Sequence, residues 1–158
     1  MNPANLDARF ITLFLDSFQS VFTQVFDCDT CRGPVSVWGN SNGHHTIAVL
    51  TGVVGGHHTG MVAYRMKEQT AKRMVGYLDP TMADFQESLF EGLGEIINIV
   101  SGNAVQHLSK NQFDLSISTP SVVAGNPLEM HLLNQTAYSV TMLSPFGEVG
   151  IDIAIKKF

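Results

Sequence analysis

Apolar residues recur at spacings of three and four in the first part of the chain, from Asn5 to about Phe26. They are Leu6, Phe10, Leu13, Phe14, Phe18, Val21, Phe22 and Val25. Such spacing places them on one face of a helix, so we expect an amphipathic helix here. The phenylalanines at every fourth position indicate either a packed core or a dimer seam.

Apolar runs rich in β-branched residues follow and predict strands. We expect the first two over VSVWG (Val35 to Gly39) and TIAVLTGVV (Thr46 to Val54). The glycine-rich stretch GGHHTG (Gly55 to Gly60) predicts a hairpin loop that leads into a third strand, MVAYRM (Met61 to Met66). The pattern of KEQTAKRMVGYL (Lys67 to Leu78) then predicts a short helix.

The longest predicted element is a helix from about Ala83 to Lys110. Beyond it we expect a strand over Asp114 to Ser118, a loop over Ser121 to Gly125, a strand over Leu128 to Gln135, and a closing hairpin formed by Ala137 to Leu143 and Val149 to Lys156. This order predicts an α+β fold in which helices cover an antiparallel sheet. At 158 residues, we expect one domain over residues 1–158.

The two faces of the long helix differ in chemistry when about 100° is allowed for each residue. The apolar side, which we expect to meet the sheet, holds Phe85, Leu89, Leu93, Ile96, Ile97, Val100, Ala104 and Leu108. The opposite side carries a polar row formed by Glu91, Glu95, Asn98 and Gly102.

Three glycines interrupt this helix at Gly92, Gly94 and Gly102, and the same projection places all three on its outward half. Each costs about 1 kcal/mol relative to alanine in an exposed helix interior. A surface poor in side chains around Glu95 and Asn98 lets another backbone approach closely, so this face is interpreted as a docking face. An acid and an amide three residues apart are also common on solvated helices, so the spacing alone is weak evidence.

Composition narrows the classes of partner. The net charge of -5 and the scattered basic residues argue against binding to nucleic acid or to anionic lipid. The sequence has no run long enough for a membrane helix and no export signal at its start, so we expect a cytoplasmic protein. Two cysteines cannot form the disulfide framework of a secreted protein, which agrees with this expectation.

The segment EGLGEIINIVSGNA resembles the signature of the CheC/CheX/FliY family of chemotaxis phosphatases. That signature is a Glu, two further residues, an Asn and a proline about twenty residues later, here Glu95, Asn98 and Pro120. The order and length of the predicted elements resemble the CheX branch. The single E-x-x-N helix also resembles CheX, whereas CheC usually carries two.

The resemblance implies hydrolysis of the aspartyl phosphate on a CheY-type response regulator. Carried over by position, Asn98 would orient the attacking water and Glu95 would pair with a lysine of the regulator. The helical projection, and not the resemblance, adds Ile99 as an apolar contact beside the row and Gly94 and Gly102 as positions that keep its surface poor in side chains. The chain would need no cofactor, because Mg²⁺ is expected on the partner. The resemblance also implies a homodimer formed through sheet edges.

One position departs from the family pattern. Four residues before the Glu the family usually has Asp or Ser, and here Glu91 stands in that place. A longer acid either serves the same supporting role or repels the acidic pocket of the partner. A receiver-binding or dimerising module of the same fold, without turnover, is therefore the alternative to an enzyme.

A third hypothesis is a zinc- or redox-sensing regulator. Cys28 and Cys31 form a C-x-x-C, and two histidine pairs, His44-His45 and His57-His58, follow it. Thiolate and imidazole are ligands that zinc prefers. Adjacent histidines on a strand point to opposite faces, however, so one of each pair would miss a shared ion. Loop cysteines and turn histidines are the simpler interpretation, and we expect no metal on this chain.

Overall fold

The computed structural model describes residues 8–37, 45–131 and 137–157. One antiparallel sheet contains all the described strands: β1 (Cys31–Val37), β2 (Ile47–Gly55), β3 (His58–Met66), β4 (Ser116–Ile117), β5 (Ser121–Ala124), β6 (Tyr138–Ser144) and β7 (Gly147–Lys157). The strands are ordered β1-β6-β7-β3-β2-β4, and β5 also pairs with β2. Strand β1 therefore forms one edge, and the short strands β4 and β5 form the other.

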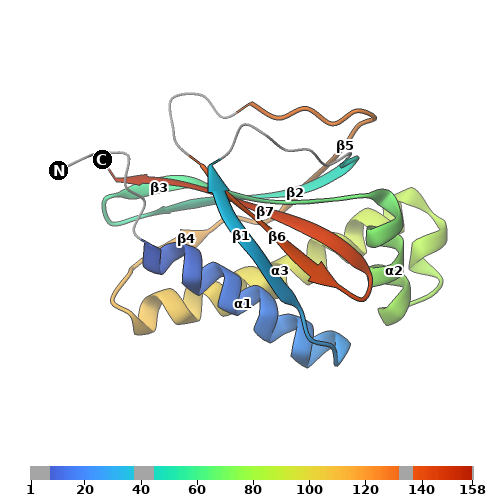
Figure 1. The fold of residues 1–158 in the computed structure, drawn as a ribbon, viewed down its shortest axis with the longest axis horizontal. Coiled ribbons are helices and arrows are strands. Elements are labelled where there is room, and N and C mark those ends of the chain that lie inside the picture. Colours follow the sequence, from blue (N-terminus) through green and yellow to red (C-terminus); the bar gives the residue numbers. More distant parts are fainter. Residues whose placement is uncertain (1–7, 38–44, 132–136, 158) are drawn as a thin grey trace.

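The helices lie against one face of this sheet (Figure 1). They are α1 (Ala8–Phe26), α2 (Glu68–Leu78), the 3-10 helix η1 (Met82–Asp84) and α3 (Gln86–Lys110). The phenylalanine stripe of α1 faces the sheet, and Phe14, Phe18 and Phe22 are each at most 1% exposed. The stripe is therefore part of the core and not a dimer seam. This confirms the predicted fold class, an antiparallel sheet covered by helices.

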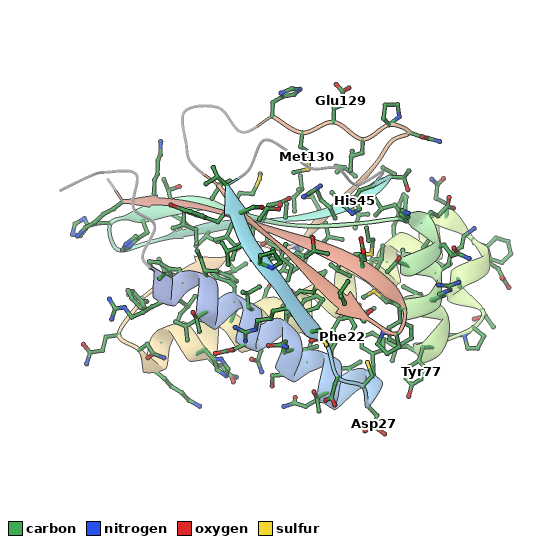
Figure 2. The ribbon with its side chains drawn as sticks, in the orientation of Figure 1. Phe22, Asp27, His45, Tyr77, Glu129 and Met130 are labelled. Atoms are coloured by element: carbon green, nitrogen blue, oxygen red, sulfur yellow. The ribbon has the colours of Figure 1, made fainter. Side chains whose placement is uncertain are left out.

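Two predictions for the segment after α3 were wrong. Ser121–Ala124 is not a loop but strand β5, because its β-branched Val122 and Val123 pair with the edge of β2. Residues 128–131 form no strand, and residues 132–135 of the strand expected there lie outside the described residues. Burial alternates here, with Leu128 and Met130 half-buried and Glu129 and His131 exposed. Figure 2 shows Met130 pointing toward the sheet and Glu129 away from it. The alternation reflects packing over the outer face of the sheet and not strand pairing.

The start of the long helix also differs from the prediction. A 3-10 turn occupies Met82–Asp84, and α3 begins only at Gln86. Phe85 has an extended backbone at the N-cap position and is 70% exposed, so it does not belong to the core-facing side. The other seven residues assigned to that side are all buried: Leu89, Leu93, Ile96, Ile97, Val100, Ala104 and Leu108.

A buried ion pair lies on the outer face of the sheet, opposite the helices. The Arg65 guanidinium binds both carboxylate oxygens of Asp152 on the neighbouring strand. Ser139 donates a hydrogen bond to the same carboxylate, and His45 Nδ1 lies 3.0 Å from Arg65 Nη1. Burial and the Arg65 charge lower the pKa of His45, so the neutral imidazole that accepts from Arg65 is favoured. These hydrogen bonds link the side chains of β3, β6 and β7.

No helix in the described ranges is both long and apolar enough to span a bilayer.

Candidate functional site

The packing of α3 orients its polar row toward solvent. Its buried side, which includes Leu93, Ile97 and Val100, fixes the rotation of the helix against the sheet and α1. As a consequence Glu95 and Asn98 are exposed, as the sequence predicted. Within the described part of the chain, neither Glu95 nor Asn98 has an ion-pair or hydrogen-bond partner, so both side chains are available to another molecule.

A groove of about 390 Å³ runs along this row. It is lined by Met82, Glu91, Gly94, Glu95, Asn98, Thr119 and Pro120. The structure thus brings Pro120 beside Glu95 and Asn98, although about twenty residues separate them in the chain. Five of the seven residues proposed from the sequence line this one groove.

The opposite wall of the groove is a β-bulge. Ile117 pairs with Val53 and Ser121 pairs with Leu50, so three residues on the outer segment face two on β2. The extra residue belongs to the Thr119–Pro120 stretch, which the bulge turns toward α3. Proline suits this place because it has no N–H to contribute to a ladder. The sequence prediction missed this bulge, and its only signal was Ser-Thr-Pro between two short β-rich runs.

The three glycines of α3 have different environments. A Cβ added at Gly94 or Gly102 would meet nothing within 4 Å, which confirms that these two glycines face open space. A Cβ at Gly92 would lie 2.7 Å from Val75 Cγ1, so the prediction that Gly92 faces outward was wrong. Helix α2 packs on that side of α3, and Gly92 lets the two helices approach. The helical projection considered the sheet but not this second helix.

Two more residues of the proposed set lie outside the groove lining. Ile99 is 46% exposed, directly after Asn98, and Gly102 is exposed one turn further along the same row. They extend the exposed surface beyond Asn98 toward the C-terminal half of α3.

The cysteines and histidines do not come together. Cys31 pairs with Leu143 of β6, which pairs with Glu148 of β7. His58 pairs with Lys157, near the other end of β7. At about 3.3 Å per residue, Glu148 and Lys157 are roughly 30 Å apart along the strand. Partial burial and the neighbouring acidic residues raise the pKa of the Cys28 thiol, which disfavours the thiolate. In the described ranges no three His, Cys, Asp or Glu side chains are grouped to hold a metal ion.

His45 belongs to the Arg65 network on the outer face of the sheet. His44 lies outside the described residues.

Comparison with solved structures identifies the fold. A CheC-like superfamily protein from Shewanella sp. PV-4 superimposes with a TM-score of 0.84 at 22% identity, over 96% of this chain and 99% of that chain. The chemotaxis protein CheX from Desulfovibrio desulfuricans matches with a TM-score of 0.81 at 20% identity, over 94% of this chain and 99% of that one. The fold is therefore that of the CheC-like chemotaxis proteins.

A third structure is a complex of CheX, CheY, BeF3 and Mg²⁺ from Borrelia burgdorferi. It matches with a TM-score of 0.76 at 23% identity, over 97% of this chain and 100% of that chain. The family described as chemotaxis phosphatase CheX matches residues 47–143, well over half of the sequence. The chain belongs to the CheX family. Among curated protein sequences, none matches it significantly.

Proposed function

We propose that this protein hydrolyses the aspartyl phosphate of a CheY-type response regulator. The observation that carries the proposal is the groove, in which the Glu95 carboxylate and the Asn98 carboxamide project side by side from α3, neither of them bound to any described residue. Membership of the CheX family and the CheX–CheY complex of a relative of the same fold support this choice of partner.

Asn98 orients the attacking water in this proposal. A carboxamide donates and accepts hydrogen bonds at once, so it can hold a water in line with the phosphorus. The water oxygen forms a bond to phosphorus while the bond to the aspartyl oxygen breaks. The products are inorganic phosphate and the free aspartate of the receiver, and the proton leaves with phosphate or solvent.

Glu95 binds the receiver and aligns it. An exposed carboxylate one helical turn before Asn98 reaches a lysine beside the phosphorylated aspartate and guides α3 into the receiver pocket. The receiver supplies Mg²⁺, which neutralises charge on the phosphoryl group. This chain contributes no nucleophile of its own.

The remaining proposed residues shape the contact. Gly94 leaves room for the receiver backbone next to Glu95, and Gly102 does the same one turn beyond Asn98. Ile99 and Pro120 provide apolar contacts on either side of the pair. Glu91 lines the groove one turn before Glu95, so it faces the same partner in the place where the family usually has a shorter side chain.

The test compares wild type with Asn98→Ala on a phosphorylated CheY-type receiver. We expect wild type to accelerate phosphate loss and the variant to lose roughly 100-fold of that acceleration while still binding a beryllofluoride-treated receiver, because misplacing a reacting group by about 1 Å costs roughly 100-fold. Binding without acceleration by wild type would favour the non-catalytic receiver-binding module. Neither binding nor acceleration by wild type would refute the proposal.

The free edge of the sheet supports a proposed homodimer. Strand β1 is seven residues long, and its Val35 and Val37 side chains are 53% and 62% exposed. Pairing of two such edges in an antiparallel manner would cover both side chains and complete the ladder. The groove lies at the β4–β5 edge, so dimerisation through β1 leaves it open.

A further inference from the structure

The Ser118 side chain binds the second wall of the groove, the bulge, to strand β2. The Gly52 N–H donates to Ser118 Oγ at 2.7 Å, and the hydroxyl donates in turn to the Thr119 carbonyl at 3.3 Å. The Ser118 N–H donates to the Gly52 carbonyl at 2.9 Å. One residue thus binds β2 through both its backbone and its side chain, immediately before the bulge.

Gly52 is matched to this arrangement. A Cβ on Gly52 would lie 3.2 Å from Ser118 Oγ, closer than an ordinary van der Waals contact. The absence of a side chain therefore lets the hydroxyl lie over β2 and accept the Gly52 N–H. We refer to Gly52 and Ser118 together as the bulge clamp.

The two walls of the groove are held by different means. The α3 wall is set by a buried apolar side that includes Leu93, Ile96 and Ile97. The bulge wall lies at the sheet edge, where Thr119 is exposed and Pro120 has no N–H to bond with β2. The Thr119–Pro120 wall is therefore held at its two ends, by the bulge clamp on one side and by the pairing of Ser121 with Leu50 on the other, and the clamp adds a side-chain hydrogen bond to this pairing.

We infer that Ser118 is a positioning residue for the phosphorylated receiver: it holds Thr119 and Pro120 at a fixed distance from Glu95 and Asn98. This inference rests on the proposed function. Ser118 does not line the groove itself, so it acts through the wall. Because Asn98 is held independently on α3, loss of the clamp should weaken capture of the receiver and spare the chemical step.

The test measures KM and kcat for phosphate release with the receiver concentration varied. Ser118→Ala should raise KM about three- to tenfold with kcat within twofold of wild type. Ser118→Thr retains a hydroxyl, so its KM should stay close to that of wild type. Ser116→Ala is the matched control, because Ser116 is another exposed serine on the same edge that pairs with Val54 and does not reach the groove. Its KM should equal that of wild type.

A second readout is independent of activity. Amide hydrogen exchange at Gly52 should become faster in Ser118→Ala and stay unchanged in Asn98→Ala, because only the former removes the acceptor of the Gly52 N–H. If wild type is active and Ser118→Ala has an unchanged KM, the inference is overturned while the proposed function stands. If wild type shows no turnover, the proposed function fails and the inference fails with it.

Discussion

Alanine at the three helix glycines separates stability from function. At Gly94 and Gly102 an added Cβ meets nothing within 4 Å, so the variant gains the full propensity difference of about 1 kcal/mol per site. For a chain of this size, that corresponds to a rise in Tm of about 2–4 °C. At Gly92 the new Cβ would lie 2.7 Å from Val75 Cγ1. Overpacking of this kind costs about 1–3 kcal/mol and offsets the gain, so Gly92→Ala should lower Tm.

The effects of these substitutions on activity should not follow their effects on stability. Gly94 lines the groove beside Glu95, and a methyl group there narrows the space for the receiver backbone. We expect Gly94→Ala to lose roughly tenfold in kcat/KM, because steric crowding at a close contact costs about 1–3 kcal/mol. Gly102 is on the same row but outside the groove lining, so Gly102→Ala should lose less than about threefold by the same reasoning.

Thermal unfolding followed by circular dichroism and steady-state phosphate release give the two quantities on the same samples. Gly102→Ala is the matched comparison, because it brings the same helix stabilisation at a site outside the groove lining. A Gly94→Ala variant that is both more stable and fully active would refute the idea that this glycine keeps the docking face smooth.

Three other predictions concern the buried network and the free edge. Asp152→Asn removes the carboxylate charge that binds the buried Arg65 guanidinium, and we expect the free energy of unfolding in urea to fall by about 3–5 kcal/mol; a fall below about 1 kcal/mol would contradict a structural role for the pair. Because the pKa of His45 is lowered in the folded chain, protonation opposes folding, so stability should decline as the pH drops below about 6.5 toward that lowered pKa. His45→Gln should remove this part of the pH profile, and a superimposable profile would argue against it. Lysine at both Val35 and Val37 should give a monomer in analytical ultracentrifugation where wild type is a dimer; a monomeric wild type would end the dimer proposal.

The exposed row on α3 could be predicted from the sequence because helical periodicity is a local property. Once Leu93, Ile97 and Val100 are turned inward, Glu95 and Asn98 must point outward. The closing hairpin was predictable for the same kind of reason, since alternation over β7 and the Pro145–Gly147 turn are contiguous in the chain.

Features that depend on contacts between distant segments were not predictable in this way. Gly92 was misplaced because its neighbour, Val75, belongs to another helix. The bulge at Thr119–Pro120 appears only when two short strands are set against β2. Arg65 and Asp152 each interrupt an apolar strand, which signals a buried charge, but only the sheet order shows that they are partners.

The most direct test of the central claim is a structure of this chain bound to a beryllofluoride- and Mg²⁺-loaded CheY-type receiver. The account predicts that α3 enters the receiver pocket, with the Asn98 carboxamide at hydrogen-bonding distance from a water or fluoride at the beryllium site and the Glu95 carboxylate on a receiver lysine. A receiver seated elsewhere, with the groove still open to solvent, would contradict it.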